Sequence, residues 1–304
     1  MMKPKKPFFS IIVPSCNRPE QLRECLESFC RLDYPRERFE VIVIDDGSRK
    51  PLNQVVKRFQ NQLDTTLVRQ ENAGPAAARN TGASHARGEF LAFTDDDCTS
   101  ASDWLRTLAD RFDTPDHIVG GRTVNALHNN TYSATTLIIR EAVYSYYNAD
   151  NRQGPFVASN NMALSAGLFN MSGGFDTNFR TSEDREFCDR WLLHGYGIIY
   201  APEAVVFHAH PLTFRSFCKL YFNYGRGAFR YHQIRARRKS GKKRSAVNFH
   251  LCLPWLLKRP MSLLPLGHIP IVIMLLMVWE VANTAGFFYE KHIASAKTHG
   301  DSND

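Results

Sequence analysis

The stretch Phe39-Glu-Val-Ile-Val-Ile-Asp-Asp-Gly-Ser48 indicates how this 304-residue chain begins to fold. Residues 39–44 are almost entirely apolar and rich in β-branched side chains, which is typical of a short strand buried on both faces. The run stops abruptly at Asp45 and Asp46, and the Gly and Ser that follow favour a turn. The pattern therefore predicts a buried strand with acidic residues at its carboxyl end.

Two other segments repeat this order of apolar strand and polar end. Residues 8–14 (FFSIIVP) lead directly into Ser15-Cys-Asn-Arg18, and residues 90–94 (FLAFT) lead into Asp95-Asp-Asp97. The intervening sequence predicts helices over residues 18–31, 52–62 and 74–86, and a further strand over residues 65–69. Strands that alternate with helices indicate an α/β fold, in which a mostly parallel sheet is flanked by helices.

The three polar strand ends should meet at one place. In open parallel sheets the carboxyl ends of the strands share an edge, and ligands bind just beyond that edge. We therefore expect the polar run 15–18, the acidic pair 45–46 and the acidic triplet 95–97 to converge there. This convergence is the first sign of a functional site.

The second half of the chain is less regular. It predicts helices over residues 132–147 and 182–194, a Gly-Gly-Phe-Asp turn at 173–176, two short strands at 198–201 and 205–207, and a basic linker at 235–244. Residues 263–279 are almost entirely apolar, although Pro265 and Pro270 interrupt them and Glu280 follows. A buried core helix fits this pattern, but we favour a membrane-associated segment or re-entrant hairpin, because Lys258 and Arg259 precede it.

Charge is distributed unevenly along the chain, whose formal net charge is +8. No Asp or Glu occurs between Ala204 and Trp279, whereas thirteen Lys and Arg lie between Arg215 and Arg259. A basic run next to an apolar segment favours contact with anionic lipid, although a solvated face is the ordinary alternative. Nucleic acid is not an expected partner, because no nucleic-acid-reading motif accompanies the charge.

The cysteines and the N-terminus indicate the compartment. The seven cysteines form no Cys-x-x-Cys pair, so a zinc site is not expected. An odd number of cysteines in a chain of this size favours reduced thiols in the cytosol. The first seven residues are basic but lead into only a short strand, so they do not form a signal peptide. We expect a cytoplasmic protein associated with the inner face of the plasma membrane.

Asp95, Asp96 and Asp97 are candidate metal ligands. Adjacent carboxylates repel one another unless a cation neutralises them, and Mg²⁺ and Mn²⁺ prefer carboxylate oxygens. A solvated turn that caps the next helix is the simpler explanation of the triplet. Asp46 is open to the same two interpretations, because it could contact a nucleotide or merely cap a helix.

Two further positions carry charge toward the predicted edge. Arg79 follows Asn72-Ala-Gly-Pro-Ala-Ala-Ala, whose small residues would let a helix pack closely on the sheet, and it could either reach a diphosphate or pair with a structural acid. Asp184 lies in the first turn of a predicted helix, where the helix dipole alone could explain an acid. A carboxylate there could also remove the proton of an attacking hydroxyl.

Taken together, these motifs resemble the family 2 glycosyltransferases. The chain reads Ile-Ile-Val-Pro-Ser-Cys-Asn-Arg, Val-Ile-Val-Ile-Asp-Asp-Gly-Ser, Asn-x-Gly-Pro-Ala-x-Ala-Arg-Asn-x-Gly, Phe-Thr-Asp-Asp-Asp-Cys, Asn-Asn-Met-Ala-Leu, Gly-Gly-Phe-Asp and Ser-Glu-Asp in that order. Each motif is common by itself, but seven in this order are specific. The resemblance covers residues 8–210. It implies the GT-A fold, a Rossmann-like nucleotide-diphospho-sugar transferase fold, and an inverting reaction.

The resemblance also implies a role for particular residues. The donor nucleotide would contact Pro14, Asn17, Arg18, Asp46, Arg79, Asp95 and Asp96. The metal, Mn²⁺ or Mg²⁺, would contact Asp95, Asp97 and His208, and a neighbouring pair of the triplet would fit equally well. The sugar and acceptor pocket would include Asn161, Gly174, Phe175, Asp176, Glu183, Arg190 and Trp191. Asp184 would be the catalytic base.

One departure from the family narrows the expected reaction. Processive members carry Gln-x-x-Arg-Trp after the base, whereas this chain keeps Arg190 and Trp191 but has Phe187 in place of the Gln. With one apolar segment instead of a multi-helix channel, the sequence predicts transfer of a single sugar per binding event. We expect a nucleotide-sugar donor, most simply a UDP-sugar, and a glycan or lipid-linked acceptor of the cell envelope.

The predicted domain organisation follows from the same motifs. A transferase domain would occupy residues 1–212, with a nucleotide-binding half at about 8–122 and an acceptor half at about 123–212. A basic, helical and apolar region would occupy residues 213–304. Two other functions stay open on the sequence alone. A nucleotidyltransferase has a similar sheet but would need a Gly-rich phosphate loop after the first strand, and a non-catalytic membrane-associated protein could retain the same motifs.

Overall fold

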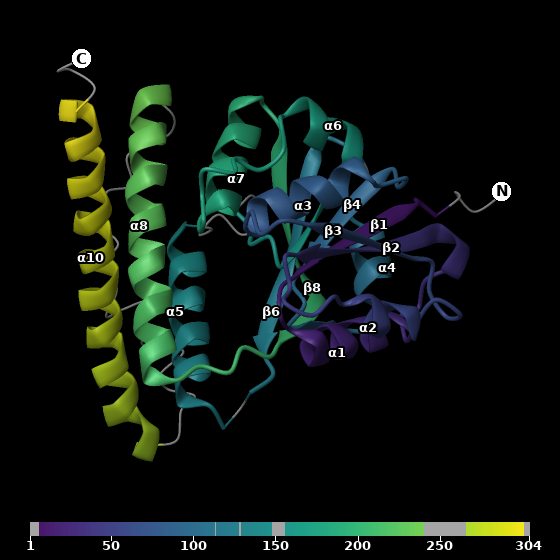
Figure 1. Ribbon diagram of the computed structural model, residues 1–304, viewed down its shortest axis with the longest axis horizontal. Coiled ribbons are helices and arrows are strands. Elements are labelled where there is room, and N and C mark those ends of the chain that lie inside the picture. The colour runs from purple at the N-terminus through teal and green to yellow at the C-terminus, as the bar shows by residue number, and fades with distance from the viewer. Residues whose placement is uncertain (1–5, 113, 128, 148–155, 240–265, 301–304) are drawn as a thin grey trace. The chain divides into compact units, whose positions relative to one another are not determined.

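Figure 1 shows the computed structural model of the chain, which describes residues 6–112, 114–127, 129–147, 156–239 and 266–300. These residues form two compact units. The first contains residues 6–126, 156–178 and 184–209, and the second contains the remaining described residues. Lys258, Arg259 and Pro265, on which part of the membrane prediction depends, lie outside the described residues.

The first unit is built on an eight-stranded sheet with the order β3-β2-β1-β4-β7-β6-β8-β5. Its strands are β1 (Phe9–Ser15), β2 (Phe39–Asp46), β3 (Thr65–Gln70), β4 (Phe90–Thr94), β5 (Cys98–Ser100), β6 (His117–Asn125), β7 (Asn161–Ser165) and β8 (Gly197–His208). The first four strands are mutually parallel, as predicted, and β6 is parallel to β8. The antiparallel pairs all involve β7 or β5. The α/β prediction is confirmed.

Helices cover both faces of this sheet (Figure 1). They are α1 (Pro19–Phe29), the short η1 (Arg36–Arg38), α2 (Asn53–Lys57), α3 (Pro75–Ser84), α4 (Trp104–Ala109), α6 (Ala166–Met171) and α7 (Glu183–Leu193). Alternate residues of β1 serve opposite faces, because side chains along a strand point alternately up and down. Ile11 joins the core with α1 and α4, whereas Gly82 of α3 lies so close to Ile12 that an added Cβ would sit 2.4 Å from its Cγ2. The small residues of this helix therefore allow the close packing that the sequence predicted.

The structure corrects several predicted elements of the first unit. The helix predicted over residues 52–62 is only α2, and β5, β6 and α4 were not predicted. The two strands predicted at 198–201 and 205–207 are one strand, β8, because its pairing with β6 jumps from Ala201 to Val205 while β6 advances only from Gly121 to Arg122. This irregularity takes up Pro202 and its neighbours without ending the strand.

The second unit consists of α5 (Thr131–Tyr147), α8 (Phe214–Arg238), the short η2 (Leu266–His268) and α10 (Ile269–Gly300). Their shared core includes Ile139 of α5, Tyr221 of α8 and Trp279 of α10. Gly225 and Gly286 let α8 and α10 approach closely, since a Cβ on either would fall 1.9 Å from a backbone oxygen of the other helix. Figure 1 shows α8 and α10 side by side over their length.

Two predictions for this unit are wrong in detail. The basic linker predicted at 235–244 is helical as far as Arg238, where α8 ends. The apolar segment is not a hairpin, because α10 runs unbroken through Glu280. Pro270 is the second residue of α10, a position where no helical hydrogen bond from its nitrogen is required. Among the described residues one helix, over Ile269–Ala296, is long and apolar enough to cross a membrane.

A buried carboxylate fixes the register of α8 against α10. Glu290 is 3% exposed, and it accepts hydrogen bonds from Arg226 Nε at 2.7 Å and Arg230 Nε at 2.6 Å. Burial opposes ionisation of Glu290, but the two guanidinium groups outweigh it and hold its pKa below the usual range. The sequence analysis did not single out this residue, because its partners are some sixty positions away.

We expect Glu290→Gln to lower the free energy of unfolding at neutral pH by about 1–3 kcal/mol, because it removes a charged acceptor from two arginines. The depressed pKa means that the stabilisation is present above the unfolded-state pKa and is lost as the pH falls through the folded-state pKa. Urea denaturation of both proteins over a pH series checks this. The difference should narrow in acid, and Lys291→Gln, an exposed neighbour, should cost little at any pH. An equal loss in both variants would contradict the argument.

Candidate donor and metal site

The predicted convergence of polar strand ends is present in the first unit. Asn17, which has a left-handed backbone with φ of 58°, donates its backbone N–H to Ser48 Oγ at 2.8 Å and accepts from the Arg49 N–H at 2.9 Å. Ser15 Oγ donates to Asp96 Oδ2 at 2.7 Å. These bonds join the loops that follow β1, β2 and β4. Pro14, the residue before Ser15, is half-buried at the end of β1.

The two aspartates at the end of strand β2, Asp45 and Asp46, accept hydrogen bonds from two different loops. Asp45 accepts from the backbone N–H of Ser48 at 2.9 Å and from that of Leu52 at 3.3 Å, so it is the residue that caps the turn. Asp46 instead accepts from Gln70 Nε2 at 2.8 Å and from the backbone N–H of Ala73 at 2.9 Å. Bonds from Asn72 and from the Gly74 N–H complete its set. Asp46 therefore holds the 70–74 loop beside the strand ends. The capping role that the sequence allowed for Asp46 is filled by Asp45.

The acidic triplet after β4 has three different environments. Asp95, 29% exposed, accepts from Arg79 Nη2 at 2.6 Å. Asp96 is buried and accepts from Ser15 and, at 3.1 Å, from Arg18 Nη1. Asp97 accepts from the same Arg18 nitrogen at 2.9 Å. The two arginines thus neutralise part of the charge that three adjacent carboxylates would otherwise concentrate.

Burial is the main influence on Asp96. It raises the pKa of this carboxyl to about 6, although Arg18 and the hydrogen bond from Ser15 pull in the opposite direction and Asp97 adds to the increase. The buried position and the two internal partners make Asp96 the member of the triplet that organises the loop. Asp95 and Asp97, on either side, pair with Arg79 and Arg18.

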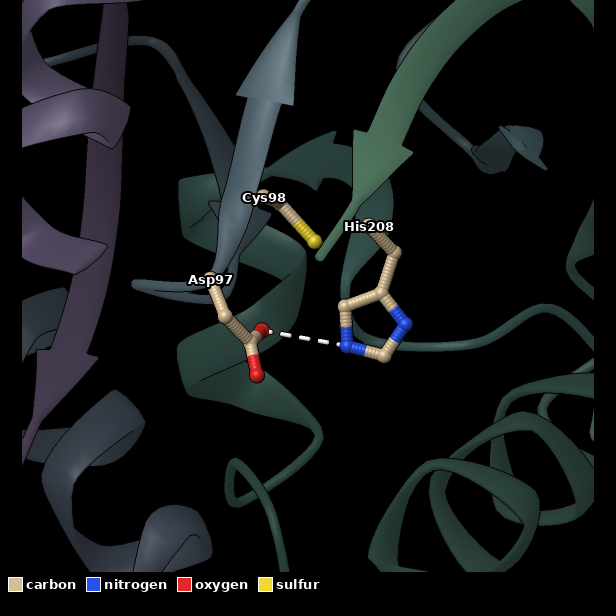
Figure 2. A group of neighbouring side chains, drawn as sticks. All are labelled: Asp97, Cys98 and His208. Carbon is tan, nitrogen blue, oxygen red and sulfur yellow. Dashed lines mark ion pairs between the residues drawn. The ribbon is translucent and has the colours of Figure 1, made fainter. Parts of the chain in front are cut away.

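Asp97 and His208 were both predicted as metal ligands, and the structure brings them together. Figure 2 shows the Asp97 carboxylate facing the imidazole, with Oδ1 3.1 Å from Nε2. The cause is the antiparallel pairing of β5 with β8, which sets Cys98 opposite His208. Asp97, Cys98 and His208 form a group whose ligand atoms lie within 4.8 Å of one another. Asp95 is not in this group.

The spacing and chemistry of this pair suit a hard divalent ion. Neighbouring ligands of an octahedral Mg²⁺ with bonds of about 2.1 Å lie roughly 3 Å apart, which matches the Asp97–His208 separation. Cys98 was missed by the sequence analysis. A thiolate would favour a softer metal such as Zn²⁺, but burial raises the pKa of the Cys98 thiol well above its usual range. The residues therefore fit Mn²⁺ or Mg²⁺ held through oxygen and nitrogen.

Arg79 and Asn80 connect α3 to the Gly-Gly-Phe-Asp turn. The Arg79 guanidinium carbon lies 5.9 Å from the ring centroid of Phe175. Asn80 accepts from the Phe175 N–H at 2.9 Å and donates to its carbonyl at 2.8 Å. Gly174 has a φ of 65°, and a Cβ there would lie 2.7 Å from Asn80 Oδ1, so only glycine fits. The turn is thereby fixed to the helix that carries Arg79.

Several residues predicted to line the sugar and acceptor pocket bond to the turn or pack in the core. Arg190 donates to the carbonyls of Ser172 and Gly174 and pairs with Glu186 at 2.9 Å, which makes it a positioning residue for the turn. Trp191 is fully buried and donates to the Gly197 carbonyl. Its place is the hydrophobic core, and its chemistry here is packing.

Asn161 and Phe175 are also internal. Asn161 is 1% exposed, and its amide group bonds to Trp104 Nε1 and to the carbonyls of Arg122 and Ala204. Phe175 is 1% exposed and packs against other aromatic rings at about 5 Å. Asp176 is half-buried and accepts from Asn178, and Glu183 is buried.

Asp184 has the properties expected of a general base. It is half-buried near the start of α7, just after Ser182, whose backbone is left-handed with φ of 69°. Its carboxylate accepts from the Arg185 N–H at 2.8 Å and from the Ser159 N–H at 3.4 Å. Burial raises the pKa of Asp184, while these bonds and the charge of Arg79 oppose the increase. A base with a raised pKa takes a proton more readily than an ordinary carboxylate.

A curled α/β sheet with acidic loops and a carboxylate–imidazole pair at the strand ends defines a nucleotide-sugar transferase of the GT-A class. The family model described as glycosyl transferase family 2 matches residues 10–170, and that of glycosyl transferase family group 2 matches residues 91–289. The chain belongs to glycosyltransferase family 2 and is a transferase enzyme.

Individual relatives and one solved structure agree with this assignment. Glycosyltransferase AglE of Haloferax volcanii is 29% identical over 231 residues, covering 73% of each chain. Pre-mycofactocin glycosyltransferase of Mycobacterium tuberculosis is 28% identical over 72% of this chain, which spans only 46% of that relative. The mannosyltransferase PcManGT of Pyrobaculum calidifontis, solved with GDP-Man and Mn²⁺, has a TM-score of 0.64 at 21% identity and covers 93% of this chain and 85% of its own. At 21% identity this likeness shows a shared fold alone.

Proposed function

We propose that this protein is an inverting, metal-dependent glycosyltransferase that moves one sugar from a nucleotide-sugar to a glycan or lipid-linked acceptor. The observation that carries the proposal is the meeting of Asp97 with His208 at the strand ends, beside Arg18 and Arg79. Carboxylate, imidazole and guanidinium groups at one edge suit a nucleoside diphosphate, which is itself an anion and a metal ligand.

The donor would bind over the loops that follow β1 and β2. Asn17 and Asp46 hold these loops together, so their side chains shape the floor on which the nucleotide lies. Arg18 and Arg79, now paired with carboxylates, carry the positive charge that a diphosphate needs, and a planar guanidinium can bond two of its oxygens at once. Mn²⁺ or Mg²⁺ held by Asp97 and His208 would supply neutralisation of the charge that develops on the departing diphosphate.

The acceptor would be activated by Asp184. As the acceptor hydroxyl attacks the anomeric carbon, its proton passes to the Asp184 carboxylate and the bond from that carbon to the diphosphate oxygen breaks. A single displacement of this kind inverts the anomeric configuration. Arg79 would act on both the donor and the base in this one step, because it pairs with Asp95 on the donor side and its charge influences Asp184.

The location of the protein and the class of its substrates rest on other observations. The basic region from Arg215 and the apolar helix α10 favour the cytoplasmic face of a membrane, where lipid-linked and cell-envelope acceptors are found. The family resemblance favours a UDP-sugar, whereas PcManGT was solved with GDP-Man. Both donor classes therefore belong in the first assay.

That assay measures release of nucleoside diphosphate from a panel of UDP-, GDP- and dTDP-sugars with Mn²⁺, Mg²⁺ or EDTA. Many transferases hydrolyse their donor slowly without an acceptor, so we expect release from one donor that EDTA abolishes and added metal restores. In a separate reaction with an acceptor or a surrogate alcohol, the anomeric configuration of the glycoside formed, read by NMR, should be opposite to that of the donor. A retained configuration would exclude the single displacement. Absence of both release and donor binding across the panel would favour a non-catalytic protein.

A further inference from the structure

The second unit carries an apolar stripe on the outer face of α10. Met274, Met277, Val281 and Phe288 are 44%, 60%, 70% and 57% exposed. They recur every three or four residues, apart from one seven-residue step, and so share one face of the helix. Side chains of this kind cost free energy when they face water, and a continuous stripe of them marks an interaction surface.

An apolar hollow lies where this stripe meets α8. It has a volume of about 330 Å³ and is lined by Cys218, Met274, Met277, Val278, Val281 and Ala282. That volume is at the lower end of the range for pockets that hold small ligands. Methionine side chains adapt to irregular apolar shapes, so the lining suits a flexible hydrocarbon chain better than a rigid ring.

Basic groups accompany the apolar surface. Arg215 and Lys219 of α8 are exposed, one helical turn apart, and they bracket Cys218 of the hollow. Lys291 is exposed at the far end of the stripe. The sequence contains no acidic residue between Ala204 and Trp279 that would offset the charge of Arg215 and Lys219, and Glu290, next to Lys291, is already paired with Arg226 and Arg230. An apolar face with a basic border complements the anionic headgroups and acyl chains of a phospholipid surface.

The path of α8 determines how α10 can lie. The two helices run in the same direction: Tyr221 of α8 packs edge-on against Trp279 of α10, with ring centroids 6.2 Å apart, and further along both helices Arg230 bonds Glu290. Phe222 and Phe229 contact α10 as well, at 5.4 and 5.3 Å between ring centroids. A bilayer-spanning α10 would therefore take α8 with it. That helix carries seven Lys and Arg, and such charges are costly within hydrocarbon.

We propose that α10 lies in the plane of an anionic phospholipid surface, with its stripe of Met274, Met277, Val281 and Phe288 among the outer acyl chains, and that it does not cross the bilayer. The hollow beside Cys218 gives part of one acyl chain a place, and Arg215, Lys219 and Lys291 contact headgroups. The inference rests on the proposed membrane location and adds to it the face that binds and the depth that it reaches.

Flotation of the full-length protein with vesicles tests this. Vesicles of phosphatidylglycerol and phosphatidylcholine in equal parts should bind the protein, vesicles of phosphatidylcholine alone should bind it more weakly, and alkaline carbonate should release it. Met277→Asp and Val281→Asp should each weaken binding to the anionic vesicles roughly tenfold or more, since each removes an apolar side chain that the acyl chains would bury and adds a negative charge that the vesicle repels. Met171→Asp is the matched control, because Met171 is 77% exposed on the first unit. It should bind as the wild type does.

The other outcomes separate this inference from the proposals that precede it. Resistance to carbonate would mean that α10 spans the bilayer, which overturns the inference but preserves the membrane location. Undiminished binding by both stripe variants would mean that another face binds. No binding to either vesicle would overturn both the inference and the location. A dimer in solution that Met277→Asp dissociates would overturn the inference, because the stripe would then be an interface between two copies of the chain. Donor hydrolysis is measured without vesicles, so the transferase proposal stands or falls separately.

Discussion

Asp184→Asn should lower the rate of sugar transfer by about 10²- to 10⁴-fold and leave the dissociation constant of the donor unchanged. The amide has nearly the shape of the carboxylate, and its single oxygen can still accept from one of the two N–H groups, those of Arg185 and Ser159, which bond to different carboxylate oxygens. It cannot accept the proton of the acceptor hydroxyl. The loss should therefore appear in the chemical step, and donor binding, measured by calorimetry with metal present, should be that of the wild type.

The pH dependence of transfer gives this prediction a second readout. Only the ionised form of Asp184 can act as a base, and burial raises its pKa. The rate of the wild-type enzyme should accordingly increase with pH through that raised pKa, whereas the residual rate of Asp184→Asn should lack this step. The assays require the acceptor, or a surrogate alcohol if the acceptor is still unknown.

Asp110→Asn is the matched control, because it makes the same chemical change on an exposed residue just after α4. It should transfer sugar at the wild-type rate. If Asp184→Asn loses donor binding instead, the residue belongs to the donor site. If it transfers at a rate near that of the wild type, another group takes the proton.

The sequence could predict the parts of this site that depend on local pattern, and it could not predict contacts between residues that are far apart along the chain. Each strand end that follows an apolar run could be located from local pattern, and the parallel arrangement then implied that Ser15, Asp45 and Asp96 would lie close together. The pairing of Asp97 with His208 depends on β5, a strand of three residues that pairs across 110 positions with β8. No local periodicity marks so short a strand, so family resemblance alone suggested His208.

Burial was the other property that the sequence could not reveal. Asn161 and Trp191 fall within motifs that indicate a functional site, yet both lie in the core with their polar atoms bonded internally. Arg190 and Asn80 bond to the backbone of the turn that contains Gly174 and so act indirectly, by fixing the position of that turn. The same limitation applies to Glu290, whose partners on α8 became apparent only when two helices far apart in sequence were seen to pack together.

The largest effect should come from Asp97→Ala. The carboxylate contacts His208 through one oxygen and Arg18 through the other, so it lies at the centre of the charged groups that would receive a metal-bound diphosphate. Its removal leaves an imidazole as the sole member of the proposed ligand pair. We expect metal-dependent release of nucleoside diphosphate to fall by at least about 10³-fold, since metal neutralisation of a leaving group is worth several kcal/mol.

A binding measurement makes this prediction independent of activity. Mn²⁺ bound to the protein gives an electron paramagnetic resonance signal distinct from that of free Mn²⁺, and Asp97→Ala should weaken this binding strongly in the presence of nucleoside diphosphate. His208→Gln should weaken it less, because an amide oxygen can replace a nitrogen ligand whereas a methyl group cannot replace a carboxylate. Asp110→Ala, the control, should bind Mn²⁺ as the wild type does. If Asp97→Ala binds Mn²⁺ with the wild-type affinity, Asp97 is not a ligand and the metal site would be assigned to Asp95 or Asp96. Folding of that variant would be verified first from its melting temperature, because the substitution removes a buried carboxylate that pairs with Arg18 and His208.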